Sequence, residues 1–335
     1  MSKEVLASQS DQFHQTKTAE YNGGKVGYSI FGDPNSELQK ILVIPGFTED
    51  SVTMQGFAEA LTDGGQRQVI VTDQPSLKFK EGFTMPIIDH QAKANLAVIS
   101  AEGLDDEPLA VVAHSMGAPI EVRMAKLAKE RGIKALDTNE GSVSLFLAPA
   151  GANPDERLLL SRDSLASRFI FKFMSRDAKE NKKFDPEGIG KKRAAKNFVG
   201  NPLKTWKETW YLSKKESTYS KLGELGLKPA VVVFPDDVLQ PQRLNQKTTE
   251  AYVSGEADYS LSGWSSAIGS LRTGTGEGEN AWLDDYRHAG HNDHARHPED
   301  VAKLVLSIFD HRMDPRNVDH IVEANRKYLQ NKEAA

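Results

Sequence analysis

The sequence predicts an α/β protein: a mostly parallel central sheet with helices on both faces, interrupted by an inserted helical segment. Three observations carry this prediction. Short apolar runs alternate with helical patterns along the first half of the chain, and most of these runs are apolar throughout, as in strands that are buried on both faces. The chain has 335 residues, of which 39% are hydrophobic, so it can form a large core. The alternation stops near residue 155 and resumes near residue 229.

The elements follow in order along the chain. Apolar runs predict strands at 26–31, 40–44, 68–71, 109–113, 143–147, 229–234 and 282–286. Helical spacing predicts helices at 54–61, 91–99, 118–129, 243–253 and 298–309. The second strand is stopped by Pro45-Gly46, and the last helix begins with Pro298 and acidic residues. The segment 261–280 is rich in Gly, Ser and Thr and is expected to be a loop.

The inserted segment differs from the rest of the chain in pattern and in charge. Residues 155–221 contain no clear strand pattern and include several aromatic residues. They carry 17 Lys/Arg and 9 Asp/Glu, a net charge of 17 − 9 = +8, which leaves −13 for the remainder of a chain whose net charge is −5. We expect a helical subdomain whose basic residues mostly form a solvated face, although they could also attract an anionic substrate.

Composition excludes several classes of protein. The chain has no cysteine, which rules out disulfides, thiolate metal sites and cysteine nucleophiles. The small net charge argues against a nucleic-acid-binding protein. The first residues contain no apolar run of a secretory signal, and no stretch reaches the roughly 18 apolar residues of a membrane span. We therefore expect a cytoplasmic protein without a membrane span.

The clearest chemical motif is A-H-S-M-G-A-P, which directly follows the predicted strand 109–113. A sharp strand-to-helix turn at Ser115 needs small residues two positions away on either side, and Ala113 and Gly117 meet that need. Such a turn exposes the serine hydroxyl and brings the amide of Met116 to a helix N-terminus, where it could stabilise an oxyanion. The simpler alternative is that Ser115 caps a helix.

With this motif the chain resembles the α/β-hydrolase superfamily, from about Val26 to Phe309. The resemblance implies an oxyanion loop at I-P-G-F-T-E-D, in which Pro45 replaces the usual histidine and the amide of Phe47 is the second oxyanion donor. It implies a core at 21–150 and 228–312 and a helical cap at 151–227, between an N-terminal extension at 1–20 and a C-terminal tail at 313–335.

The resemblance also implies the other two members of a catalytic triad. The acid is expected just past the strand 229–234, where F-P-D-D-V-L-Q-P puts Asp237 four residues before a proline; Asp236 is the alternative. The general base commonly follows a glycine, between the last strand and the last helix. In R-H-A-G-H-N-D-H-A-R-H-P only His291 follows a glycine.

The same stretch raises the alternative of a metal site. His288, His291, His294 and His297 recur at every third position, and Asp293 adds a carboxylate. Gly290 and Pro298, however, argue against one continuous helix through all four histidines. We therefore expect no metal and no cofactor, with His294 and His297 on the approach to the last helix. His114 is expected to be a packing or pocket-lining residue.

These motifs together predict a serine hydrolase that acts through an acyl-enzyme on a small or medium apolar carboxyl ester (EC 3.1.1), with a small-molecule substrate as its partner. The same residues could serve an acyltransferase or an amide or carbon–carbon hydrolase, and a hydrolase fold can also be kept as a non-catalytic binding protein. The sequence leaves the oligomeric state open.

Overall fold

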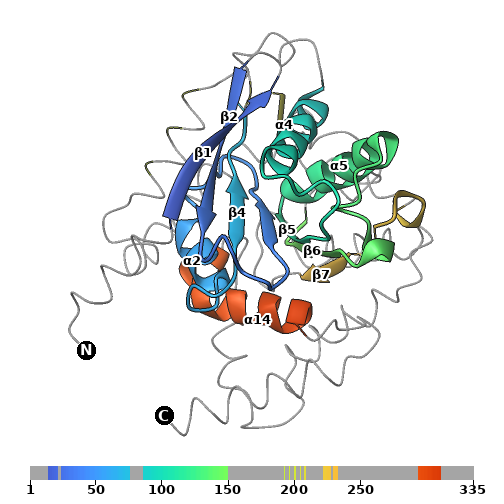
Figure 1. Cartoon of the computed structure of the whole chain (residues 1–335). Coiled ribbons are helices and arrows are strands. Elements are labelled where there is room, and N and C mark those ends of the chain that lie inside the picture. The colour runs from blue at the N-terminus through green and yellow to red at the C-terminus, as the bar shows by residue number, and fades with distance from the viewer. Residues whose placement is uncertain are drawn as a thin grey trace, which may run out of the picture.

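The computed structural model describes residues 14–21, 24–75, 86–149, 222–227, 229–232 and 293–310, together with single helical positions between 192 and 208. Figure 1 shows these residues in colour. The predicted strand at 282–286, the predicted helix at 243–253, the predicted tail and most of the predicted cap lie outside the described residues.

The centre of the structure is a seven-stranded sheet with strand order β1-β2-β4-β3-β5-β6-β7. The strands β1 and β2 pair antiparallel, as do β2 and β4, whereas β3 to β7 are parallel to one another. The strands are β1 (His14–Tyr21), β2 (Gly24–Phe31), β3 (Ile41–Ile44), β4 (Val69–Thr72), β5 (Ala110–His114), β6 (Val143–Leu147) and β7 (Ala230–Val232). The prediction of a mostly parallel sheet is confirmed.

Helices cover both faces of this sheet. The helices α4 (Ile87–Ala101) and α5 (Gly117–Arg131) pack on one face, and α2 (Gln55–Leu61) and α14 (Pro298–Asp310) pack on the other (Figure 1). Side chains of the parallel strands alternate between the two cores: in β5, Val111 and Ala113 face α4 and α5, whereas Ala110 and Val112 face α2 and α14. Burial on both faces explains why these strands are apolar throughout.

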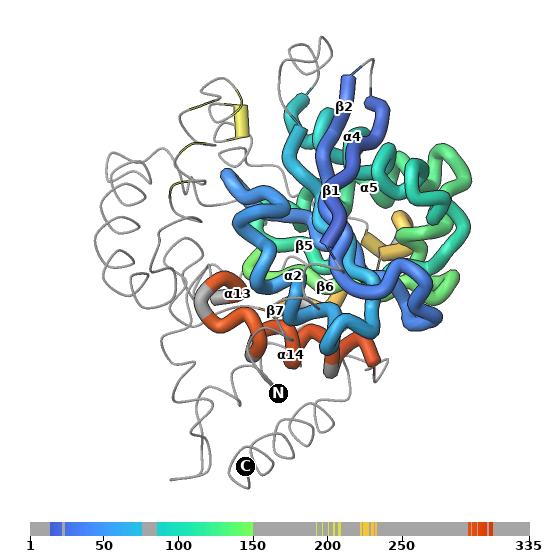
Figure 2. The backbone as a smooth tube through the Cα atoms, turned by 60° about the vertical axis from the view of Figure 1, so that its left-hand side comes forward, coloured from blue at the N-terminus to red at the C-terminus, as the bar shows by residue number. Residues whose placement is uncertain are grey.

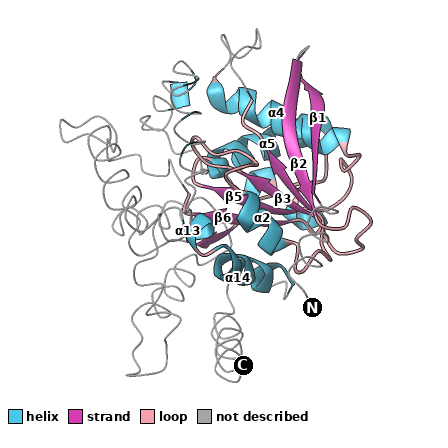
Figure 3. Ribbon diagram, turned by 90° about the vertical axis from the view of Figure 1, so that its left-hand side faces the viewer, coloured by secondary structure: helices cyan, strands magenta, loops and turns pink. Residues whose placement is uncertain are grey.

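The elements differ from the predicted ones at two places. The strand β1 is not among the predicted strands; it pairs along its whole length with β2, and the two form the edge ribbon that Figure 3 shows. Most of its side chains are exposed or half-buried, so its sequence H-Q-T-K-T-A-E-Y has no apolar run to reveal it. The helix α4 begins four residues before its predicted start, directly after Pro86.

The parallel strands bring several loops to one edge of the sheet. Because β3, β4, β5 and β6 run in the same direction, the residues that follow them lie at the same edge: Pro45-Gly46, Asp73, Ser115 and Ala148. The short helix α13 (Asp293–Arg296) contacts α2 and leads into α14 (Figure 2). The candidate site lies at this edge, where ligands of open parallel sheets commonly bind.

A buried contact at Glu208 joins the predicted cap to the core. Glu208 is 1% exposed and accepts a hydrogen bond of 2.6 Å from Nε2 of Gln91 on α4. Nζ of Lys204, one helical turn earlier, lies 3.0 Å from the same carboxylate. A buried ion pair that is also hydrogen-bonded to the core therefore fixes this part of the inserted segment against α4.

None of the helices in the described part of the chain combines the length and the apolar character that a membrane-spanning helix needs.

Candidate active site

Ser115 lies on the turn between β5 and α5. The strand ends at His114 and the helix begins at Gly117, so only two residues make the turn. Ser115 has a φ of 49°, in the left-handed region that side-chain-bearing residues rarely adopt, and its N–H donates a 2.8 Å hydrogen bond to the carbonyl of Leu147 on β6. A strained backbone held in this way is a feature that clusters at functional sites. The predicted strand–turn–helix around Ser115 is confirmed.

Close packing explains the small residues around this turn. A Cβ atom at Gly117 would lie 2.3 Å from the carbonyl oxygen of Ile44, so only glycine fits between α5 and β3. A Cβ atom at Gly46 would lie 3.0 Å from Cβ of Ser115. The loop that follows β3 therefore passes directly against the serine.

The two predicted oxyanion donors belong to segments that meet at Ser115. Met116 is the residue before the first residue of α5 and has helical dihedrals, so its amide belongs to the first turn of that helix. Phe47 follows Gly46 in the loop after β3 and packs against the core on the side of α4 and α5. The fold thus brings both peptide segments to the serine, as a shared oxyanion site would require.

The predicted acid and base lie outside the described residues. These are Asp237, its alternative Asp236, and His291. The described part of β7 ends at Val232, five residues before Asp237, and α13 begins two residues after His291. Because β7 is parallel to β5 and β6, its carboxyl end lies at the edge of the sheet that carries Ser115.

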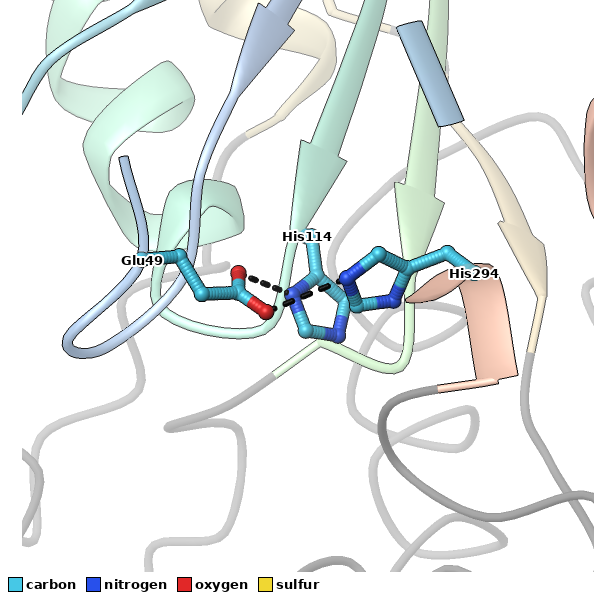
Figure 4. A group of neighbouring side chains, drawn as sticks. All are labelled: Glu49, His114 and His294. Carbon is cyan, nitrogen blue, oxygen red and sulfur yellow. Dashed lines mark hydrogen bonds and ion pairs between the residues drawn. The ribbon is translucent and has the colours of Figure 1, made fainter. Parts of the chain in front are cut away.

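The structure brings together three further residues beside the serine: Glu49, His114 and His294 (Figure 4). Oε2 of Glu49 lies 2.7 Å from Nδ1 of His114, and Oε1 of Glu49 lies 3.1 Å from Nε2 of His294. Both imidazoles are 1% exposed and the carboxylate side chain is 12% exposed. The two rings also contact each other, with centroids 4.1 Å apart. We call these three residues the Glu–His–His cluster.

The cluster keeps its carboxylate ionised. Burial alone would raise the pKa of the Glu49 carboxyl, but the nearby imidazoles of His114 and His294 and their hydrogen bonds hold that pKa well below its usual range. The backbone N–H of Gly46 donates a further hydrogen bond of 2.7 Å to Oε2 of Glu49. The buried charge is therefore hydrogen-bonded to the N–H of Gly46 and to His114, and His294 lies at ion-pairing distance from its other oxygen.

The cluster also has the residue types of a metal site. One ligand atom from each of Glu49, His114 and His294 lies within 4.8 Å of the other two. In the structure, Nδ1 of His114 is hydrogen-bonded to Oε2 of Glu49, and Nε2 of His294 lies at ion-pairing distance, 3.1 Å, from Oε1, so the three side chains contact one another directly.

The sequence predicted the surroundings of the two histidines but not the cluster that they form with Glu49. His114 is a buried packing residue, as expected, and His294 and His297 lie on the approach to α14, as expected. The helix is broken between α13 and α14, as Pro298 indicates. The role of Glu49 was missed, although it stands in the loop I-P-G-F-T-E-D; a carboxylate three residues after Gly46, with a histidine beside Ser115, was the available indication.

Comparisons with known proteins agree with this architecture. No family model and no curated protein matches the sequence. Among solved structures, the chain is similar to a bacterial membrane phospholipase A, with a TM-score of 0.59 and 14% identity over 92% of this chain and 89% of that one.

Two other solved structures have similar folds. One is the thioesterase domain from the curacin biosynthetic pathway, with a TM-score of 0.51 and 15% identity over 88% of this chain and 99% of that one. The other is a serine hydrolase from Cycloclasticus zankles, with a TM-score of 0.51 and 15% identity over 90% of this chain and 99% of that one. The protein thus has the α/β-hydrolase fold, and the resemblance found in the sequence is confirmed at the level of the fold.

Proposed function

We propose that the protein is a serine hydrolase that cleaves a carboxyl ester through an acyl-enzyme. The observation that carries the proposal is the backbone of Ser115, which has a φ of 49° on a two-residue turn between β5 and the N-terminus of α5. A helix cap does not need this strained conformation, whereas a nucleophile raised above the end of its strand does.

In the proposed mechanism, Oγ of Ser115 attacks the ester carbonyl carbon and its proton passes to the imidazole of His291. Asp237 orients that imidazole and stabilises its charged form. The amides of Phe47 and Met116 stabilise the oxyanion of the tetrahedral intermediate. The carbon–oxygen bond to the alcohol then breaks, and the alcohol leaves with the proton from His291. A water molecule, deprotonated by the same imidazole, then attacks the acyl carbon; the bond to Oγ of Ser115 breaks, the imidazole returns the proton to Oγ, and the carboxylic acid leaves.

The substrate class rests on the predicted cap. Aromatic residues between 169 and 211 would favour a small or medium apolar acyl or alcohol group. A substrate screen decides whether the protein cleaves an ester, an amide or a carbon–carbon bond. A competing alcohol in the same screen decides whether water or another acceptor takes the acyl group.

The test is covalent labelling with a fluorophosphonate probe, compared between the wild type and Ser115→Ala and read by intact mass and peptide mapping. We expect a single adduct on Ser115 that is absent from the variant. A folded wild-type protein that is not labelled would refute the activated serine and would favour the alternative of a non-catalytic binding protein.

Three further variants test the triad assignment. We expect His291→Gln and Asp237→Asn to lower the labelling rate by about 100-fold or more, since triad members act as a unit. Asp236→Asn is the matched control and should change the rate by less than about threefold. If the labelling rate falls strongly in Asp236→Asn and little in Asp237→Asn, the triad acid is Asp236.

A further inference from the structure

We propose that Glu49 is a positioning residue that fixes the oxyanion loop, residues 45–50, against the serine. This inference rests on the proposed function. It assigns to the Glu–His–His cluster a role in catalysis that does not involve contact with the substrate. Glu49 makes contacts within the loop and contacts to two other segments of the site, and these contacts hold a strained backbone.

Glu49 first makes contacts within its own loop. Glu49 closes a tight turn twice, because its N–H donates to the carbonyl of Gly46 over 3.3 Å and its Oε2 accepts from the N–H of Gly46 over 2.7 Å. The peptide between Gly46 and Phe47, which carries the predicted oxyanion donor, lies inside this turn. Its orientation therefore depends on the carboxylate of Glu49.

The carboxylate of Glu49 also contacts two other segments of the site. His114 is the residue immediately before Ser115, and its Nδ1 lies 2.7 Å from Oε2 of Glu49. His294 lies three residues after His291 in the sequence, and its Nε2 lies 3.1 Å from Oε1 of Glu49. One carboxylate thus links the oxyanion loop, the serine turn and the segment that follows the predicted base (Figure 4).

The backbone of this loop is strained at Thr48. Thr48, between Phe47 and Glu49, has a φ of 65°, which is rare and unfavourable for a β-branched residue. Such a conformation persists only when its surroundings impose it, and its neighbours do so here from several sides. Nε2 of Gln74 donates to the carbonyl of Pro45 over 2.8 Å, and Oδ1 of Asp73 accepts from the N–H of Ser51 over 2.9 Å. These bonds hold the two ends of the loop, and Glu49 holds its middle.

The first variant to test is Glu49→Ala, which removes all of the carboxylate contacts. Misplacing a catalytic group by a fraction of an ångström to one ångström costs up to about 100-fold in rate, so we expect kcat for p-nitrophenyl acetate to fall by about 10- to 100-fold. We expect KM to change by less than about threefold, because the oxyanion forms after substrate binding.

Glu49→Gln is the conservative variant. Its amide oxygen can still accept from Gly46 and His114, while its NH₂ group can donate to His294 in the other imidazole tautomer. We expect a smaller loss in kcat than for Glu49→Ala, of about 3- to 10-fold. The matched control is Glu59→Gln, which removes an exposed carboxylate of the nearby helix α2 and should leave kcat unchanged.

A transition-state analogue separates positioning from general loss of structure. A trifluoromethyl ketone forms a tetrahedral adduct with a catalytic serine, and its oxyanion uses the same donors as the reaction. We expect its inhibition constant to rise in the Glu49 variants by the same factor by which kcat/KM falls. An active Glu49→Ala variant with wild-type kcat and a wild-type inhibition constant would overturn the proposal.

Long-range ¹H–¹⁵N NMR of the histidine rings tests whether the cluster exists, and this experiment does not require a measurement of enzyme activity. We expect protected N–H protons on Nδ1 of His114 and Nε2 of His294, assigned with His114→Gln and His294→Gln, and their loss in Glu49→Ala. A stoichiometric metal ion in the purified protein that disappears in His294→Gln would overturn the hydrogen-bonded cluster. If a fluorophosphonate probe does not label the wild-type protein, the proposed function is refuted. The NMR result would still decide whether the cluster exists.

Discussion

Glu121 on α5 should make the stability of this protein depend strongly on pH. Its side chain is fully buried and faces β6, where Oγ of Ser144 donates a 2.6 Å hydrogen bond to Oε1. Burial raises the pKa of the Glu121 carboxyl from its ordinary value of 4.5 to about 8, because the hydrogen bond from Ser144 offsets only part of the cost of burying the charge. At neutral pH this carboxyl is therefore protonated in the folded protein.

The pKa difference sets the size and the sign of the effect. In the unfolded chain Glu121 ionises near 4.5, whereas in the folded protein it keeps its proton until about pH 8. Its contribution to stability is fully present below pH 4.5 and is lost as the pH rises through about 8. A difference of 3.5 pH units at about 1.4 kcal/mol per unit amounts to about 5 kcal/mol.

The variant Glu121→Gln removes the ionisation and keeps the shape, and its amide oxygen can still accept from Ser144. The assay is urea-induced unfolding of wild type and variant at pH values from 5 to 9. We expect the free energy of unfolding of the wild type to fall relative to the variant by about 1.4 kcal/mol per pH unit, and this fall to level off above about pH 8. Glu59→Gln, at an exposed position, serves as the control and should show no such slope.

A constant difference between wild type and Glu121→Gln from pH 5 to 9 would refute this reasoning. It would mean that Glu121 is ionised in the folded protein and that a nearby cation compensates its charge. The measurement is independent of catalysis, because Glu121 is not part of the candidate active site.

Three further predictions concern the turn at Ser115 and the buried ion pair. Ser115→Gly should be more stable than Ser115→Ala by about 1 kcal/mol, measured by chemical unfolding, because glycine relieves the left-handed strain; equal stabilities would refute that strain. Gly117→Ala should lower stability by about 1–3 kcal/mol and slow fluorophosphonate labelling, because its Cβ meets the carbonyl of Ile44. Glu208→Ala should lower the free energy of unfolding by about 3–5 kcal/mol, because it leaves the charge of Lys204 buried without its partner, and it should speed proteolysis within 155–221. An unchanged free energy of unfolding and an unchanged rate of proteolysis would contradict this prediction.

The parts of the fold that follow local patterns were predictable from the sequence. The strands β3 to β6 are apolar runs because the cores on both faces of the sheet require it, and Gly117 marks a position where only glycine fits. The edge strand β1 has little burial to impose a pattern, so its polar sequence resembles a loop. The predicted acid and base, and the predicted cap, stay predictions.

The Glu–His–His cluster could not be predicted in this way because its contacts are distant in sequence. Glu49 and His114 are 65 positions apart, and His294 is the second residue of α13, near the other end of the chain. No spacing rule relates the three residues; they meet only because parallel strands end at one edge of the sheet. The even spacing of the four histidines pointed to a shared role, whereas His294 is paired with a carboxylate from the other end of the chain.

Glu49 and Glu121 show how partners decide the state of a buried carboxyl. Both are removed from water, which by itself favours the neutral form. Glu121 has one hydroxyl donor and keeps its proton, so it behaves as a neutral packing residue within the core. Glu49 has the N–H of Gly46 and two imidazoles, so it keeps its charge and can hold three segments together. Glu121 avoids the cost of a buried charge by keeping its proton, whereas Glu49 keeps its charge, which supports our proposal that Glu49 orients the predicted oxyanion loop.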